Sequence, residues 1–507
     1  MKLGGEGLLS WLDPKRDYFP YGRWITHDVG RWWDAMLRLE SAIGFSIPAH
    51  IEGASLRNLH WLTDNPDSIL FVPPGLDWHL MRFELHSLRE GILAFNALVE
   101  FRNSQWAREK GHQYLMTIDR CLKEDFTWDV DKFEYTRHFT GSEYEHPIHV
   151  PANANMGQKL PTHGRCIEAL VWFYKATGDD LAIELAERLA RFHLQYAINP
   201  DGTIPDELTA EDSPQGDRQS YLYTLCGLLL FGTMTGQSEY VEAVVNAYKI
   251  GVPSIVNQSG WVAHDLGRLN FPDKIGNPMA NTESTGAAAR LALWIAEYTG
   301  KPDCYDDVER LVRARLFPGQ TTEVDLLFEK PSNYPRKKGG WGENDFPHAG
   351  KGCNPSGTAE IIHTFCALYQ RIYRHDKTGL VINLHFDYDD ENIHINSVRN
   401  ERATLTIKPR IHDNILIRIP GWVPQETIKF EVQGKPVTPT FVGPYAFLAK
   451  THISIGADIS LNYALPSKRT TEAMPAGDTY EFSWRGDEIT GVMPNDKPLP
   501  FYPSMTS

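Results

Sequence analysis

Hydrophobic residues recur at helical spacing through most of the first 376 positions of this 507-residue chain. Three stretches share one pattern, in which an apolar helix ends at a Thr-Gly turn and a second helix follows. The turn glycines are Gly178, Gly236 and Gly300, which stand where a helix C-terminus favours a left-handed residue. They lie roughly 60 residues apart, which leaves room for long loops between hairpins. This period predicts a toroid of helical hairpins; the alternative is an α-solenoid scaffold, whose repeats are normally shorter and more regular.

The period changes near residue 377. The segments LVINLHFDY, ATLTIKPRI and NILIRIPGWV alternate apolar and polar residues, and turns rich in Asp, Asn and Gly separate them. This predicts an antiparallel β-sandwich over residues 377–467. Residues 468–507 are rich in Pro and Gly but keep aromatic residues, so we expect this tail to pack on the body. The expected fold is mainly α: an (α/α)6 helical toroid over residues 1–376, then a C-terminal antiparallel β-sandwich domain.

The composition adds to this prediction only by excluding two classes of binding partner, nucleic acids and membranes. The net charge of −15 argues against nucleic acid, because phosphate binding needs clustered Lys and Arg. The N-terminus does not resemble a signal peptide, and nowhere do the roughly 18 uncharged apolar residues of a membrane span occur. We therefore expect a cytoplasmic protein that binds neither nucleic acid nor membrane. The sequence does not decide the oligomeric state, and a homodimer is one open alternative.

Candidate chemistry lies in loops just ahead of the repeat helices, because such loops converge at one end of a toroid. One loop places His163 before the helix that starts near Ile167. Two more loops mix carboxylates, imidazoles and tryptophans, the residue types of a sugar-binding cleft. The substrate-binding candidates in these two loops are Trp261, His264, Arg268, Trp341, Glu343, His348 and Cys353.

Asp265 and Glu283 are the predicted catalytic pair. Cleavage of a glycosidic bond needs one group that protonates the leaving oxygen and a second that acts as nucleophile or activates water. A helix N-terminus stabilises an ionised carboxylate, so Glu283 suits the second role better than the first. The structural alternatives are that Glu283 complements a helix dipole beside an N-cap at Thr282 or Asn281, and that Asp265 is a surface turn residue. His163 equally well satisfies a helix terminus.

The order of these features resembles the β-L-arabinofuranosidase family of glycoside hydrolases. The resemblance covers about Leu80 to Val423, with its best anchors in THGRCIEALVWFYKATGDD, NTESTGAAARLA, GCNPSGTAE and ILIRIPGWV. It implies a toroid that releases a sugar from an oligosaccharide. It also implies a zinc ion held by a Glu, a Cys two residues later and two adjacent cysteines, one of them the proposed nucleophile.

The zinc set of that family is incomplete in this sequence. The matching residues are Glu283 and Cys353, but Thr285 and Gly352 stand where the family has cysteines. Because zinc normally takes at least three protein ligands, we predict no metal and no other cofactor here. Catalysis by the carboxylates of Asp265 and Glu283 is the expectation that follows.

We therefore expect a glycoside hydrolase that releases an arabinofuranose-like or related sugar from plant or algal oligosaccharides. The second hypothesis is a polysaccharide lyase or sugar epimerase on the same toroid. The groups available to it as base or uronate ligand are His163, His264, Arg218 and Tyr221. The third is a non-catalytic carbohydrate-binding protein, favoured if Asp265 and Glu283 lie far apart or are buried in salt bridges.

Overall fold

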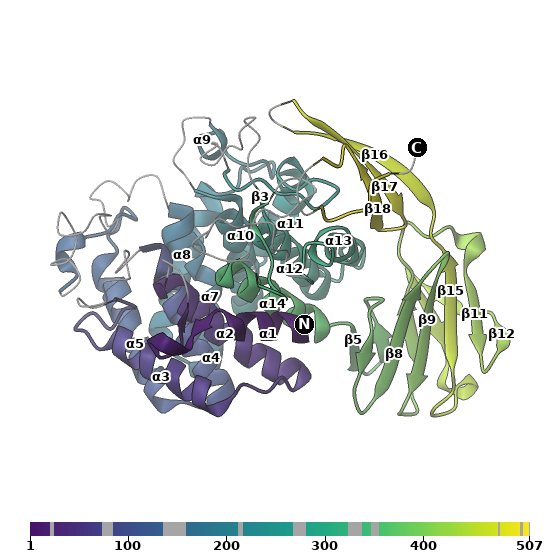
Figure 1. The fold of residues 1–507 in the computed structure, drawn as a ribbon, viewed down its shortest axis with the longest axis horizontal. Coiled ribbons are helices and arrows are strands. Elements are labelled where there is room, and N and C mark those ends of the chain that lie inside the picture. Colours follow the sequence, from purple (N-terminus) through teal and green to yellow (C-terminus); the bar gives the residue numbers. More distant parts are fainter. Residues whose placement is uncertain are drawn as a thin grey trace.

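Six helices form a closed inner ring in the computed structural model, which describes residues 1–20, 25–72, 85–134, 159–210, 216–266, 280–322, 337–345, 354–474, 477–496 and 500–505. Each inner helix packs against the next one along the chain, and the last packs against the first. The six are α2 (Ile25–Ile43), α4 (Leu88–Arg102), α7 (Cys166–Thr177), α10 (Arg218–Thr235), α12 (Thr282–Thr299) and α14 (Pro355–Tyr369). The predicted helical toroid is confirmed (Figure 1).

Outer helices cover this ring. Residues at three- and four-residue spacing bury one face of each, as Leu185 and Leu189 do in α8. The predicted turns at Gly178, Gly236 and Gly300 all have positive φ. The outer helices are α3 (Ala49–Thr63), α5 (Gln105–Cys121), α8 (Asp180–Tyr196), α11 (Ser238–Ile250) and α13 (Cys304–Leu311), with α1 (Lys2–Ser10) against α14 and a short α9 (Asp206–Thr209).

Two sheets pack into the predicted C-terminal β-sandwich. One has the strand order β13-β14-β10-β6-β5 and the other β12-β11-β15-β9-β8-β7. All neighbouring strands are antiparallel except β6 and β10, which run parallel. The strands are β5 (Tyr373–Asp376), β6 (Gly379–Ile382), β7 (Tyr388–Asp389), β8 (Ile393–Arg399), β9 (Arg402–Pro409), β10 (Ile415–Arg418), β11 (Lys429–Val432), β12 (Lys435–Val437), β13 (Thr440–Val442), β14 (Tyr445–Leu448) and β15 (Ile459–Ala464).

A third sheet follows the sandwich, where the sequence had suggested only a packed tail. It consists of β16 (Ser467–Ala473), β17 (Thr479–Arg485) and β18 (Glu488–Met493), and it reaches back from the sandwich toward the helical domain (Figure 1). Alternate residues of β17 are buried, and they form a hydrophobic cluster with Trp261, Ala263 and Ala280 of the helical domain. The chain's last sheet therefore packs on the segments that lead to Asp265 and Glu283.

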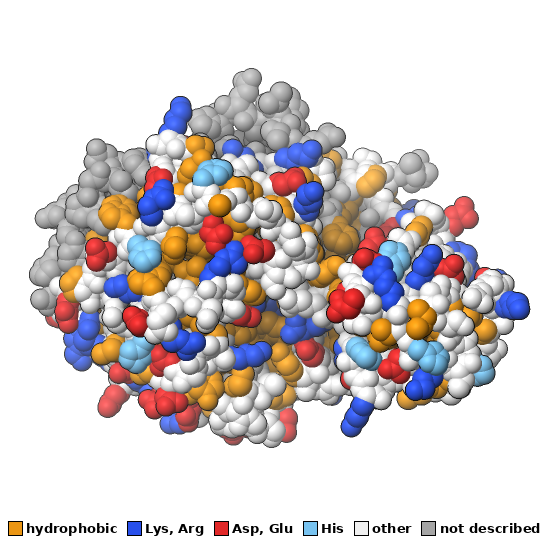
Figure 2. Space-filling view, turned by 90° about the horizontal axis from the view of Figure 1, so that it is seen from below, with side chains coloured by type: hydrophobic (Ala, Val, Ile, Leu, Met, Phe, Trp, Pro, Cys, Tyr) orange, Lys and Arg blue, Asp and Glu red, His pale blue; other side chains and the backbone are white. Residues whose placement is uncertain are grey.

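Buried ion pairs join the helical domain to the β domain. Arg418 of β10 binds Glu309 of α13 at 2.5 Å, and Arg313 binds Asp487 at 2.8 Å. On the face seen in Figure 2, acidic and basic side chains are interspersed over both domains. Within the described part of the chain, every helix is too short or too polar to cross a membrane.

Candidate functional site

Polar side chains gather inside the ring toward the N-terminal ends of the inner helices. Eight charged residues from five of these helices and their N-terminal flanks are almost fully buried there. We call them the ionic centre: Arg31, Arg89, Arg165, Arg290, Glu90, Glu168, Glu283 and Glu360. The sixth inner helix, α10, adds Gln219 and Tyr223. Since a buried charge needs a partner, the equal number of each sign is what allows so many in one place.

Ion pairs link the ionic centre across the ring. Arg31 lies 2.6 Å from Glu283 and 3.0 Å from Glu90. Arg89 lies 2.7 Å from Glu360. The close approach of α2 to α4 depends on Gly30, where a Cβ would lie 1.9 Å from the Glu90 carbonyl oxygen. Two further pairs, Arg165 with Glu90 at 2.9 Å and Arg290 with Glu168 at 3.0 Å, complete the network.

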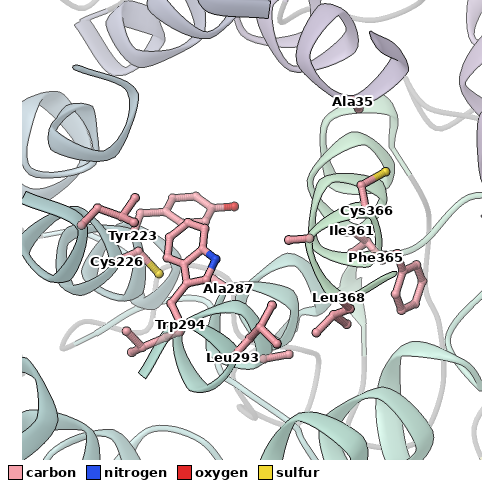
Figure 3. Packing of buried hydrophobic residues seen from close by; sticks show 14 of the residues in the cluster. Ala35, Tyr223, Cys226, Ala287, Leu293, Trp294, Ile361, Phe365, Cys366 and Leu368 are labelled. Atoms are coloured by element: carbon pink, nitrogen blue, oxygen red, sulfur yellow. The ribbon is translucent and has the colours of Figure 1, made fainter. Parts of the chain in front are cut away.

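Tyr223 stands at the middle of this network. Its hydroxyl donates to Glu360 at 2.7 Å, and the guanidinium groups of Arg89 and Arg290 lie 4.3 and 5.1 Å from its ring centroid. Figure 3 shows the side chains of Tyr223 and Trp294 projecting into the space enclosed by the inner helices. Cation–π contacts thus hold the Tyr223 ring, and the hydrogen bond to Glu360 fixes its hydroxyl.

The carboxylates of the centre differ in how they ionise. Burial opposes ionisation of Glu360, but Arg89, Arg31 and Arg290 outweigh it and hold the pKa of Glu360 well below its usual range. For Glu168 burial outweighs the nearby Arg290 and Arg89, so its pKa is raised. Surroundings of similar composition therefore lower the pKa of Glu360 and raise the pKa of Glu168.

Glu283 lies in the first turn of α12 and is nearly buried. Its Oε2 accepts hydrogen bonds from Arg31 and from the side-chain amide of Gln219. A Cβ on Gly357 would lie 3.1 Å from Glu283 Oε1, so a glycine there leaves room for the carboxylate beside the start of α14. Two hydrogen-bond donors thus hold one carboxylate oxygen of Glu283 in place at the start of α12.

The zinc ion of the resembling family does not fit the two matching positions that the structure describes. The carboxylate of Glu283 is bound by the cationic guanidinium of Arg31. The hydroxyl of Thr285, where the family has a cysteine, donates to the Gly260 carbonyl oxygen at 2.6 Å. Gly352 and Cys353 lie outside the described residues. Glu283 and Thr285 are therefore not expected to hold a catalytic metal.

His264 and Asp265 form a pair on the segment that precedes α12. His264 Nδ1 lies 2.8 Å from Asp265 Oδ1, and the side chains are 22% and 5% exposed, respectively. Arg218, the residue before Gln219 on α10, donates to the Asp265 carbonyl oxygen at 2.9 Å. The Asp265 carboxylate is thus buried, whereas the His264 imidazole is partly open to solvent.

Neighbouring contacts bring this pair to the same end of the ring as Glu283. Arg218 holds the His264–Asp265 segment, and the adjacent Gln219 holds Glu283. Thr285, two residues beyond Glu283 on α12, donates a hydrogen bond to the carbonyl oxygen of Gly260 in the same segment. The predicted catalytic residues therefore share one neighbourhood, but Glu283 lies within a buried salt bridge, which was the condition that favoured a non-catalytic role.

Three other predicted site residues are packing residues in this structure. Trp341 is fully buried, and its Nε1 donates to the Leu316 carbonyl oxygen at 2.7 Å. Trp261 belongs to the cluster under β16–β18. His163 is 1% exposed, and its Nδ1 lies 2.8 Å from His193 Nε2. We therefore do not assign any of the three to substrate.

The remaining predicted residues are only partly described. Arg268 and His348, like Cys353, lie outside the described residues. Glu343 belongs to β4 (Glu343–Asp345), whose backbone pairs with β3 (Ala280–Asn281) immediately before α12. This pairing places the Glu343 backbone beside the start of the helix that carries Glu283.

Sequence reasoning missed the residues that hold Glu283. Arg31 and Gln219 lie within apolar helical segments rather than in loops, as does Glu360, which pairs with Arg31. His27 was also missed; its Nε2 lies 2.8 Å from Arg31 Nη2 in the first turns of α2. The available signal was a charged residue at a position that the helical period assigns to the core, because such a residue requires a buried partner.

The His163–His193 pair predicts a sensitivity to acid. Burial lowers the pKa of His163 to about 3 and that of His193 well below its usual range. Unfolded histidine has a pKa of about 6.5, so between roughly pH 6.5 and 3 the unfolded chain binds protons that the folded chain does not. Stability then falls as the pH falls, by about 1.36 kcal/mol per pH unit for each such histidine.

We expect His163→Asn to reduce the slope of unfolding free energy against pH between about pH 6 and 5. The reduction should approach the contribution of one histidine, about 1.36 kcal/mol per pH unit. Urea unfolding at several pH values measures it. The exposed His452→Asn is the control and should leave the slope unchanged. A slope in His163→Asn equal to that of the wild type would contradict the buried, neutral state.

No protein-family model matches this sequence, and no curated protein matches it. Solved structures do share its fold. A GH127 β-L-arabinofuranosidase from Geobacillus stearothermophilus is 16% identical with a TM-score of 0.57, over 96% of this chain and 80% of that one. A GH127 β-arabinofuranosidase is 13% identical with a TM-score of 0.57, over 96% and 78%. A cellobiose 2-epimerase from Spirochaeta thermophila is 14% identical with a TM-score of 0.50, over 71% and 91%.

Proposed function

We propose that this chain is a glycoside hydrolase that releases an arabinofuranose-like or related sugar from plant or algal oligosaccharides. The observation that carries the proposal is the placement of Glu283. The carboxylate stands in the first turn of an inner helix, and Thr285 of the same helix donates a hydrogen bond to the segment that leads to His264 and Asp265. Likeness in fold to two β-arabinofuranosidases supports the choice of substrate class.

Glu283 takes the role of the charged group in the reaction. Departure of the leaving oxygen makes the anomeric carbon positive, and an ionised carboxylate near that carbon lowers the barrier by attack or by charge stabilisation. Arg31 and Gln219 donate hydrogen bonds to the carboxylate and fix its orientation. Because Arg31 and Gln219 already occupy Oε2, stabilisation of charge suits Glu283 better than abstraction of a proton.

His264 takes the role of proton donor to the leaving oxygen, and the imidazole left neutral then accepts a proton from the water that attacks the anomeric carbon. Because Nδ1 faces Asp265, the proton available to a leaving oxygen is the one on Nε2 at the opposite edge of the ring. Asp265 is then a positioning residue, which fixes the tautomer and stabilises the imidazolium, as the acidic member of a catalytic triad does. This assignment changes the role that the sequence suggested for Asp265.

A sugar epimerase is the second candidate, and the His264–Asp265 pair is the observation that favours it. Proton transfer at a carbon beside a carbonyl needs an imidazole of this kind rather than two carboxylates. The lyase alternative has less support. Arg218 is bound to the backbone carbonyls of Ile255 and Asp265, and burial raises the pKa of Tyr221, which disfavours Tyr221 as a base.

A panel of aryl glycosides tests the proposal, including arabinofuranosides of both configurations. Wild type, Glu283→Gln and Asp265→Asn are compared after unfolding curves have shown that all three fold. Release of aglycone from one substrate, lost in Glu283→Gln, supports the hydrolase. Conversion of a reducing disaccharide to its epimer without cleavage, followed by NMR, identifies the epimerase. Saturable binding of oligosaccharide with no turnover identifies the binding protein.

Glu472 of β16 anchors the segment that carries His264 and Asp265. It accepts hydrogen bonds from Ser259 N and Ser259 Oγ, both at 2.7 Å, and from the side-chain amide of Asn257 at 3.1 Å. Glu472 is 8% exposed and Ser259 is fully buried. The C-terminal sheet thus fixes the segment from outside, while Thr285 fixes it from within the ring.

We expect Glu472→Ala to lower kcat about tenfold to a hundredfold with little change in KM, because misplacement of a proton donor affects the chemical step more than binding. Steady-state rates well below the unfolding temperature measure it. The matched control is Glu481→Ala on the adjacent strand, where the lost partner is the exposed Arg469. Equal rates in the two variants would remove Glu472 from any positioning role.

A further inference from the structure

A cavity lies at the other end of the ring, among the C-terminal halves of the inner helices. Its volume is about 250 Å³, and its lining includes Arg38, Trp172, Trp294, Tyr298, His363 and Ala367. Figure 3 shows Trp294 projecting from α12 into the space enclosed by the inner helices. Along α12, Tyr298 is fifteen residues beyond Glu283, which corresponds to about 22 Å of helix. No member of the ionic centre, Glu283 included, lines the cavity, which is therefore separate from the candidate catalytic site.

His363 presents a hydrogen-bond acceptor to this cavity. Its ring is 2% exposed, and Nδ1 is hydrogen-bonded to Asp34 Oδ2. Burial lowers the pKa of His363 to about 4, so the ring is neutral and Nδ1 carries the proton that Asp34 accepts. His363 lines the cavity whereas Asp34 does not, which leaves the Nε2 edge of the ring toward the cavity.

Within the described residues, His363 Nε2 has no hydrogen-bond partner. The lone pair on a neutral Nε2 accepts a hydrogen bond and does not donate one. His363 Nε2 is absent from the fully enclosed side-chain atoms that lack a partner, so it is reached from the cavity, and a donor that enters from solution can pair with it. A hydroxyl group meets this requirement, and an anion does not.

The charges of the cavity favour a neutral ligand. Arg38 is bound to Asp34 at 2.7 Å, and Arg371, at the rim, is bound to Glu297. Carboxylates therefore compensate both guanidinium groups, and the lining also contains one exposed residue of each charge, Lys175 and Glu100. The guanidinium groups can still donate hydrogen bonds to ligand oxygens without attracting a net negative charge.

The walls and the size favour one sugar ring. The indole of Trp172 stacks on His363 with ring centroids 5.0 Å apart, and Trp294 lies edge-on to it at 5.8 Å. Aromatic walls with a few convergent polar groups suit a compact ligand that has apolar C–H faces and hydroxyls. The volume is below the usual range for drug-sized ligands of about 300 to 1,000 Å³, so an oligosaccharide does not fit inside.

We infer that this cavity binds one neutral monosaccharide, one of whose hydroxyls donates to His363 Nε2. The site is distinct from the catalytic one, and only the choice of sugars for its test rests on the proposed function. A toroid with such a site carries a sugar at each end: a substrate at the N-terminal ends of the inner helices and a single ring at the other.

Isothermal titration calorimetry with L-arabinose, D-xylose, D-galactose and D-glucose at millimolar concentrations tests the inference. We expect one sugar to bind wild type and Glu283→Gln equally. Ala367→Phe, which places a ring in the cavity, should weaken that binding at least tenfold and leave the catalytic rate unchanged. If Ala367→Phe fails to fold, Tyr298→Ala at the exposed rim is the second variant, with an expected loss of several-fold.

The outcomes separate this inference from the proposed function. Hydrolysis by wild type together with no binding of any of the four sugars overturns the inference alone, and the cavity then holds only water. Binding that both variants retain at full strength also overturns it. Binding that Ala367→Phe or Tyr298→Ala weakens, in a protein that hydrolyses no glycoside, supports the inference while the proposed function fails.

Discussion

Glu283→Gln is expected to lower kcat by a factor of about 10² to 10⁴ on whichever glycoside the wild type cleaves. The amide has nearly the same shape as the carboxylate, but it brings no charge to the developing positive centre at the anomeric carbon. Arg31 retains Glu90 at 3.0 Å and Glu360 at 3.4 Å, so the variant should remain folded. Initial rates and thermal unfolding curves measure the two effects separately.

The matched control is Glu297→Gln on the same helix. Glu297 lies near the far end of α12 in an exposed ion pair with Arg371, so its charge should be dispensable for catalysis. A Glu283→Gln enzyme as fast as this control would show that Glu283 is only a member of a structural network. The hydrolase mechanism proposed for it would then have to be abandoned.

Arg89→Met is expected to reduce the free energy of unfolding by about 3 to 5 kcal/mol, because it leaves buried carboxylates without their cation. Arg89 is fully buried and reaches Glu360 at 2.7 Å, Glu90 at 3.3 Å and Glu168 at 3.4 Å. Urea unfolding measures the loss. Arg57→Met, which removes an exposed pair with Asp17, should change stability by no more than about 1 kcal/mol.

The double variant Arg89→Met with Glu360→Gln distinguishes a coupled network from independent contacts. Once the cation is gone, neutralising Glu360 relieves an uncompensated charge, so the double variant should be less destabilised than the sum of the singles. Strict additivity would mean that solvent already screens the ionic centre, contrary to the burial seen here.

The toroid and the sandwich followed from the sequence because both depend on local periodicity. Turns such as Gly178 mark helix ends within a few residues, and alternation in ATLTIKPRI marks a strand regardless of what packs on it. Placing candidates ahead of repeat helices found Glu283 for the same reason. Each of these inferences needs only neighbours along the chain.

The partners of Glu283 did not follow, because they are distant in sequence. Arg31 is 252 residues away, and nothing local links the two. Trp261 and Trp341 were assigned to substrate because they lie in polar loops, yet Trp261 is covered by a sheet more than 200 residues later. Only the three-dimensional arrangement shows which loop aromatics are buried.

The ionic centre also constrains the order in which the chain can fold. Arg89 and Glu360 are separated by 271 residues, so that pair forms only after the last inner helix has been synthesised and has met α4. Until then the charges on the early helices must stay hydrated, which keeps their inward faces from collapsing prematurely. Contacts of such long range slow folding. Closure of the ring is therefore expected to be a late, cooperative event in which dehydration and neutralisation of the charges occur together.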